Sequence, residues 1–124
     1  MRLAIIILSV LVAIEHIWFM VLEMFLWTKP IGLKTFKMTA EKAEISKTLA
    51  QNQGFYNGII AAGVIWALVA YLQSKGIGQL RFFFIAVIAA GLVGWLTTGN
   101  IRIFFVQSIP SIIALGLTFG VANQ

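Results

Sequence analysis

The chain contains no cysteine and only two prolines among its 124 residues. Without cysteine, disulfides are excluded, and so is any metal or redox chemistry that uses thiolates. Charged residues make up only 10% of the chain, against about 25% in a typical soluble domain, whereas 60% of the residues are hydrophobic. This composition, with its long apolar runs, indicates an integral membrane protein.

Four apolar runs predict four membrane-spanning helices. A helix rises about 1.5 Å per residue, so about 20 residues cross a hydrocarbon core of about 30 Å. We therefore expect an all-α fold, a transmembrane four-helix bundle in one integral membrane domain (1–124), with spans at about 3–27, 55–72, 80–98 and 101–121. The apolar character continues past Glu15, so we interpret the first run as a retained helix and not as a cleaved signal peptide.

The long connection at residues 28–50 is rich in lysine. Lys29-Pro30 and Gly32 are expected to break the first helix. Thr39 is a suitable N-cap for a new helix that begins near Ala40. The run after Ala40 is mostly polar and leads into the second span, so we expect the second helix to extend beyond the membrane. The other two connections are expected to be tight turns.

The net charge of +5 is concentrated beside the predicted spans. Basic residues in such positions contact anionic lipid headgroups or set the topology, and no nucleic-acid motif accompanies them. The expected partner is therefore the lipid bilayer of the cell membrane and not a nucleic acid. The positive-inside rule places the Lys-rich connection in the cytoplasm and both termini outside.

Small residues recur at four-residue spacing in three of the predicted spans. They are Gly54, Gly58 and Ala62 in the second, Ala86, Ala90 and Gly94 in the third, and Gly116 and Gly120 in the fourth. In lipid, such stripes let helix backbones approach closely. They predict tight packing within the chain, with a homodimer interface as the alternative.

The first span carries three ionisable residues, Glu15, His16 and Glu23. Ser9, His16 and Glu23 are spaced by seven, so their side chains lie almost on one helix face. Placing a charged side chain at the centre of a membrane helix costs about 2.5–3.5 kcal/mol on insertion scales, and such residues usually face a bundle interior and have a function. This polar face is the candidate functional site.

Glu23 forms the outer layer of this site. Consecutive spans are antiparallel, so the end of the first helix meets the beginning of the second. Glu23 is then expected at the level of Asn52, Gln53 and Asn57, of which the last two share a helix face.

Glu15 and His16 form a central layer about 10 Å deeper. We expect them to lie beside the middle of the fourth span, where Gln107 and Ser111 share a face as secondary members of the site. Burial opposes the charged form of these groups, while a Glu–His contact favours it. Whichever of these two effects dominates, Glu15 and His16 are the best candidates for proton exchange near neutral pH.

We expect no metal and no cofactor at this site. His16 and Glu23 are too far apart along the helix to be obvious ligands of one ion. The remaining ligands would be the amides of Asn52, Asn57 or Gln107, which suit transition metals poorly. A haem would depend on His16 alone as its axial ligand, so we do not expect a haem either.

Several of these residues also carry a family resemblance. Glu15-His16, then Leu22–Trp27, then the segment 52–57 (Asn-Gln-Gly-Phe-Tyr-Asn) followed by Ala61-Ala62-Gly63 resemble a family of small bacterial integral membrane proteins catalogued as a domain of unknown function. The resemblance covers most of the chain and is most specific in the Asn-Gln-Gly-x-Tyr-Asn segment. It implies a four-helix membrane protein and does not imply any particular activity.

Three functions fit these observations. The first is a carrier or channel subunit, proton-coupled, with a small molecule or an ion as its substrate, because midplane ionisable clusters are typical of such sites. A chain of this length leaves little room for a wide pathway, so a homodimer is then expected. The second is a membrane enzyme that acts on a lipophilic substrate through Glu15 or His16, with Asn57 as the orienting group. The third is a structural or assembly protein. We favour the first and assign no catalytic residue.

Overall fold

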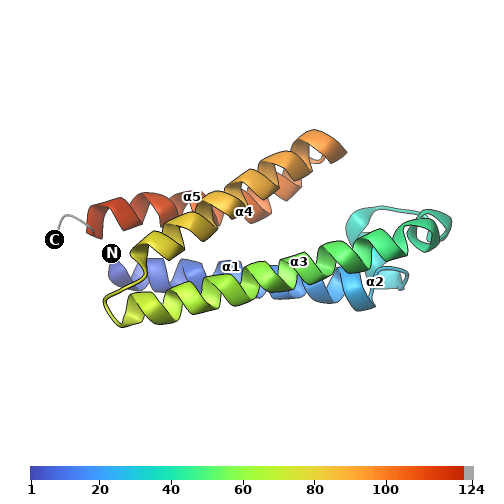
Figure 1. The fold of residues 1–124 in the computed structure, drawn as a ribbon. Coiled ribbons are helices and arrows are strands. Elements are labelled where there is room, and N and C mark those ends of the chain that lie inside the picture. Colours follow the sequence, from blue (N-terminus) through green and yellow to red (C-terminus); the bar gives the residue numbers. More distant parts are fainter. Residues whose placement is uncertain (122–124) are drawn as a thin grey trace. The chain divides into compact units, whose positions relative to one another are not determined.

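The computed structural model describes residues 1–121, and over this range the chain is helical without strands. The helices are α1 (Arg2–Phe25), α2 (Pro30–Phe36), α3 (Ala40–Leu72), α4 (Ile77–Thr98) and α5 (Ile101–Val121), as Figure 1 shows. Helices α1, α3, α4 and α5 are long and apolar enough to cross a membrane. The predicted all-α fold with four membrane-crossing helices is therefore confirmed.

The surfaces of these four helices suit a lipid environment. Large apolar side chains such as Leu3, Phe82 and Leu96 are 65–70% exposed. In water, an apolar surface of this extent would promote aggregation. In a bilayer it would contact lipid tails, which are as apolar as these side chains. Four such helices indicate a multi-pass membrane protein.

The chain divides into two compact units. The first contains residues 1–13 together with those from 62 onward, and the second is Ile14–Ala61. Helices α1 and α3 each contribute to both units, whereas α4 and α5 belong to the first and α2 belongs to the second.

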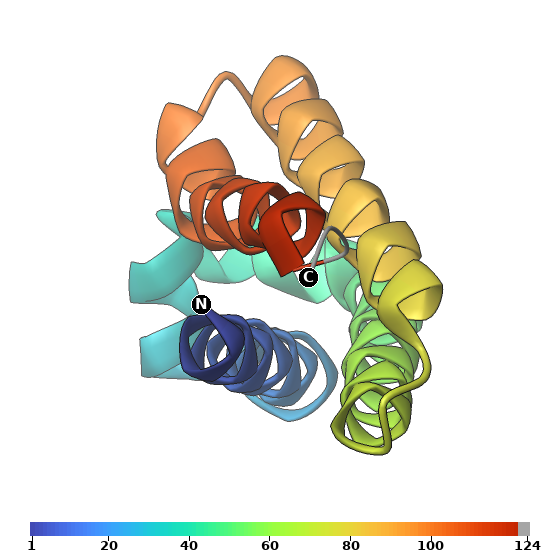
Figure 2. The same cartoon turned by 90° about the vertical axis from the view of Figure 1, so that its left-hand side faces the viewer.

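In the first unit, α4 packs along α5, as the end-on view in Figure 2 shows. The buried core of this unit consists of Ile5, Ala67, Leu68, Tyr71, Leu80, Phe84 and Ala114. The close approach of α4 to α5 occurs at Gly91, where an added Cβ would lie 3.3 Å from Gln107 Cβ and closer still to the Ser108 hydroxyl. Of the predicted stripe on α4, Gly94 lies close to α5, where an added Cβ would be 2.8 Å from Ile103 Cγ2, whereas Ala90 is exposed and does not pack within the chain.

Polar side chains inside the first unit are paired mainly with helix backbone. Ser9 donates to the Ile5 carbonyl at 2.7 Å, and Ser108 donates to the Ile88 carbonyl at 3.2 Å. Arg81 donates to Thr118 through Nε and Nη2 and lies over the Phe119 ring, 4.2 Å from its centroid. These contacts satisfy groups that water cannot reach in a bilayer.

In the second unit, the Lys-rich connection contains a helix that sequence analysis missed. Pro30 occupies the first turn of α2, where its missing N–H costs nothing, so it starts this helix as well as following α1. Gly32 is buried within α2, and a Cβ added there would lie 2.7 Å from the Trp27 carbonyl oxygen. The expected break of the first helix is present, since α1 ends at Phe25, but the sequence did not predict that a short second helix begins at Pro30.

The predicted beginning of the next helix is confirmed. Thr39 Oγ1 accepts a hydrogen bond from the Lys42 amide at 3.2 Å, which is the N-cap interaction, and α3 then runs without interruption from Ala40. Trp27 supports this segment by packing against Phe36 with the two rings tilted, their centroids 4.7 Å apart, and by donating to Ser46 Oγ at 3.1 Å. The long second helix is thus fixed at its polar end.

Candidate functional site

The centre of the candidate site is a hydrogen bond between α1 and α3 in the second unit. Asn57 Nδ2 donates to Glu23 Oε2 at 2.6 Å. Glu23 is only 6% exposed, and Asn57 is half-buried. The sequence placed Glu23 at the level of this part of α3, and the bond to Asn57 satisfies one oxygen of a carboxyl group that is shielded from water.

Two glycines allow the helices to come close enough for this bond. A Cβ at Gly54 would lie 2.6 Å from Met24 Cγ and 3.0 Å from Glu23 Cβ, and one at Gly58 would lie 2.7 Å from Met20 Sδ. All three distances are shorter than ordinary contacts. At Gly58 the Met20 side chain could move aside, whereas at Gly54 the Met24 amide nitrogen also lies only 3.1 Å from the added Cβ, so Gly54 is the position that most needs glycine. The predicted small-residue contact is confirmed at these two positions.

His16 and Glu15 lie deeper along α1 in the same unit. His16 is 1% exposed, and its ring meets Phe19 edge to face, with centroids 6.1 Å apart. Glu15 is half-buried, and its Oε2 atom is buried with no hydrogen-bond partner among residues 1–121. An unpartnered carboxyl oxygen in an apolar helix is costly, so Glu15 needs an explanation beyond helix packing.

The other predicted members lie elsewhere. Asn52 and Gln53 are exposed on α3, one turn before Asn57. In the first unit, Gln107 is half-buried on α5, whereas Ser111 is fully buried and its hydroxyl has no hydrogen-bond partner within the described chain. That these residues form a layer with Glu15 and His16 stays a prediction.

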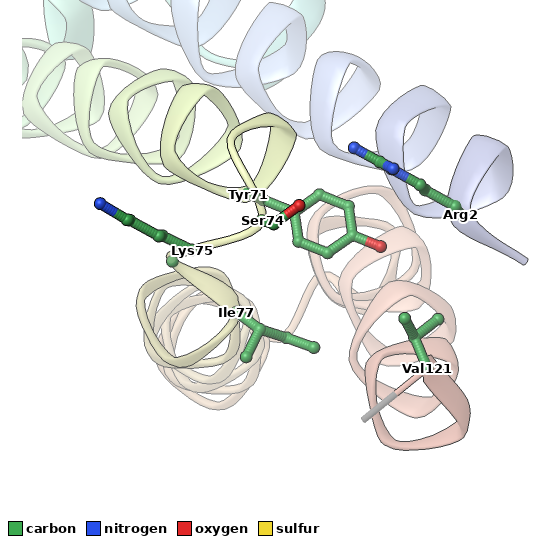
Figure 3. Close-up of a pocket in the computed structure, with 7 residues that line it drawn as sticks. Arg2, Tyr71, Ser74, Lys75, Ile77 and Val121 are labelled. Atoms are coloured by element: carbon green, nitrogen blue, oxygen red, sulfur yellow. The ribbon is translucent and has the colours of Figure 1, made fainter. Parts of the chain in front are cut away.

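Two cavities lie in the first unit, and neither contains a residue of the predicted site. One of about 270 Å³ lies where α3 ends and α4 begins, and it is lined by Arg2, Tyr71, Ser74, Lys75, Gly76, Ile77 and Val121 (Figure 3). The other, of about 440 Å³, is a wide and mainly apolar hollow beside Trp66 and Phe82. Sequence analysis missed the first because Arg2 and Tyr71 are far apart in the chain.

Among residues 1–121, no group of three or more His, Asp or Glu side chains is arranged to hold a metal ion. The side chains of Glu23, Asn57, Glu15 and His16 can form hydrogen bonds, and those of the glutamates and the histidine can exchange protons.

Comparisons with known proteins place the chain in a family whose function is unknown. Residues 10–119 match the family described as "Protein of unknown function (DUF1304)". The chain is also 38% identical over 116 residues to the "Uncharacterized protein YpaA" of Lactococcus lactis subsp. lactis (strain IL1403), covering 92% of this chain and 95% of that protein. No solved structure matches the chain.

Proposed function

The chain belongs to the DUF1304 family of proteins of unknown function, and we propose that it is a small proton-coupled membrane carrier or channel subunit. In this proposal the Glu23 carboxyl exchanges the proton, and Asn57 holds it in place by a hydrogen bond. The observation that carries the proposal is the 2.6 Å hydrogen bond from Asn57 to a carboxyl group that is only 6% exposed.

A purely structural role for this pair is hard to reconcile with its energetics. An interhelical hydrogen bond in a membrane contributes only about 0.6 kcal/mol on average. Inserting an acidic side chain at the centre of a membrane helix costs about 2.5–3.5 kcal/mol, and less nearer its ends. Even near the end of α1, where Glu23 lies, an apolar pair would hold α1 and α3 together at lower cost. The free-energy cost of placing Glu23 in the membrane therefore favours a role that needs an ionisable group.

Asn57 is suited to both protonation states of Glu23. An amide side chain has two N–H donors and one carbonyl acceptor. The charged carboxylate accepts from Nδ2, whereas the protonated acid donates to Oδ1 after the amide turns over. Glu23 can thus gain and lose a proton while it stays hydrogen-bonded, so exchange does not require the two helices to separate.

Glu15 and His16 extend this chemistry along α1. They precede Glu23 by about two helical turns, a rise of about 10–12 Å. Imidazole is the side chain best suited to proton exchange near neutral pH, and the buried Oε2 atom of Glu15 has no hydrogen-bond partner among residues 1–121 that would compete for a proton. We propose that the three residues form a proton path, with Glu23 at its mouth.

One chain offers little room for the substrate itself. The exposed apolar faces of the four long helices are available for a second copy as well as for lipid. We therefore propose that the carrier works as a homodimer, with a small molecule or an ion as the transported substrate.

Proton movement through purified protein tests this function. In proteoliposomes that contain a pH-sensitive dye, the wild-type protein is expected to dissipate an imposed pH gradient, and Glu23→Gln is expected to reduce the rate at least about tenfold, because glutamine keeps the shape and cannot exchange a proton. Glu41→Gln is the matched control, since Glu41 is exposed on the polar end of α3. A wild-type rate no higher than that of empty liposomes contradicts a proton path through Glu23.

The alternative is an enzyme that acts on a lipophilic substrate, which needs a cavity beside its acid or base. The two cavities described above are lined by other residues than Glu15 and His16, so neither of them carries this alternative.

The orientation follows from the charge distribution, and we propose that the connection between α1 and α3 faces the cytoplasm. Because the chain has no cysteine, single cysteines report this directly. In intact cells, Lys42→Cys is expected to resist a membrane-impermeant maleimide, and Gln73→Cys is expected to react. The opposite pattern would reverse the orientation.

A further inference from the structure

The cavity at the junction of α3 and α4 combines features that favour a bound anion. It lies where α3 ends at Leu72 and α4 begins at Ile77, next to the first residues of α1 and the last described residues of α5. In a chain that crosses the membrane, the ends of four helices lie at the level of the lipid headgroups. Any ligand here would therefore meet the interface and not the hydrocarbon core.

The first feature is the uncapped beginning of α4. Its N-cap is Gly76, in the left-handed conformation with φ +79°, and no side chain caps the helix. The first amides of a helix have no partner within it, and with the helix dipole they attract negative charge. None of the described residues that line the cavity is acidic.

The second and independent feature is a buried phenol. Tyr71 is only 6% exposed, and its hydroxyl has no hydrogen-bond partner in the described part of the chain. Figure 3 shows this hydroxyl directed toward the side of the cavity formed by Arg2 and Val121. A buried hydroxyl without a partner is costly, and a ligand in the cavity would satisfy it.

Arg2 supplies the positive charge. Its Nη2 atom donates to the Leu72 carbonyl at 3.1 Å, and its guanidinium carbon lies 5.9 Å from the centroid of the Tyr71 ring. These two contacts fix the guanidinium beside the cavity while leaving other N–H groups free to bind an anion. The Lys75 ammonium points away in Figure 3, so Lys75 contributes mainly backbone to the lining.

We propose that this cavity binds the phosphate of an anionic phospholipid headgroup. Arginine and helix N-termini are both suited to phosphate oxygens, and the tyrosine hydroxyl adds a third donor. The volume of about 270 Å³ lies just below the range of small-molecule pockets, about 300–1,000 Å³, so it suits a headgroup and not a whole lipid. The acyl chains would lie along the exposed apolar faces of the helices.

Lipid binding by purified protein in a neutral detergent tests this proposal. The probes are short-chain phosphatidylglycerol, short-chain phosphatidylcholine and inorganic phosphate, and the readout is the dissociation constant by native mass spectrometry or calorimetry. Any affinity tag is cleaved off beforehand because Arg2 and Val121 both line the cavity. We expect phosphatidylglycerol to bind more tightly than either of the other two probes.

Three variants locate the site. Arg2→Gln is expected to weaken phosphatidylglycerol binding at least about tenfold, which corresponds to the loss of one charge-assisted hydrogen bond. Tyr71→Phe removes only the hydroxyl and is expected to weaken binding about threefold to tenfold. Arg102→Gln is the control, because Arg102 is an exposed cation at the beginning of α5, outside the cavity. Its affinity is expected to match that of the wild type.

Each remaining outcome overturns part of the proposal. If the wild type and Arg2→Gln bind phosphatidylglycerol equally tightly, the cavity is not the binding site and the proposal is wrong. Equal affinity for phosphatidylcholine removes the preference for an anionic headgroup. If inorganic phosphate binds as tightly as phosphatidylglycerol and depends on Arg2 in the same way, the ligand is a soluble phosphate compound and not a lipid.

Discussion

Replacing Gly54 with leucine is expected to destabilise the protein by about 3 kcal/mol, the upper part of the range for overpacked cores. A Cβ alone at this position would lie 2.6 Å from Met24 Cγ, 3.0 Å from Glu23 Cβ and 3.1 Å from the Met24 amide nitrogen. The last of these atoms is backbone, so a rotamer change of Met24 does not relieve the whole clash. Helices α1 and α3 must move apart locally, and the bond between Glu23 and Asn57 is lost with them.

Gly116→Leu provides the matched control for this prediction. Gly116 also lies inside a long helix, but a Cβ there meets nothing within 4 Å. Unfolding in mixed micelles, followed by circular dichroism, is expected to show little change in stability for Gly116→Leu and a large loss of stability for Gly54→Leu. Equal stability of the two variants would mean that α1 and α3 are not in close contact at Gly54.

The second large effect is expected from Asn57→Leu. This change leaves the Glu23 carboxyl buried without its 2.6 Å donor, and leaving a charged group unsatisfied costs about 2–3 kcal/mol or more. The free energy of unfolding in mixed micelles measures this loss. Gln53→Leu, at an exposed position one turn earlier on α3, is the control and is expected to change stability little.

The double variant Glu23→Met with Asn57→Leu separates stability from function. Replacing both members of a buried polar pair with apolar groups of similar size is often neutral or stabilising. We therefore expect the double variant to be at least as stable as the wild type while proton movement in proteoliposomes is lost. If the double variant is the least stable of the set, the pair serves mainly to hold α1 and α3 together.

Much of the helical architecture could be predicted from the sequence. Long apolar runs specify membrane helices almost regardless of tertiary context, because a bilayer leaves no other way to satisfy the backbone. The N-cap at Thr39 could also be predicted, since capping depends on residues within one turn. The level of Glu23 beside the beginning of the apolar part of α3 could be predicted, because an antiparallel connection fixes which ends of two helices meet. Which of Asn52, Gln53 and Asn57 bonds to it could not.

What the sequence did not specify depends on packing or on ambiguous signals. Proline ends one helix and also starts another, so Pro30 alone did not distinguish a loop from α2. On α4, spacing by four favoured Ala90, whereas the approach to α5 occurs at Gly91, because helix rotation is set by all the contacts together. The cavity beside Arg2 and Tyr71 joins residues about 70 positions apart, and no local pattern marks such a contact.

The central claim is that the Glu23 carboxyl exchanges a proton while enclosed by the protein. Infrared difference spectroscopy of the protein in lipid bilayers measures this directly, because protonated and charged carboxyl groups absorb at different frequencies. As the pH is varied, the wild type and the Glu41→Gln control are expected to share a carboxyl signal that Glu23→Gln lacks. If the spectra of Glu23→Gln and wild type change identically with pH, Glu23 does not exchange a proton and the account is wrong.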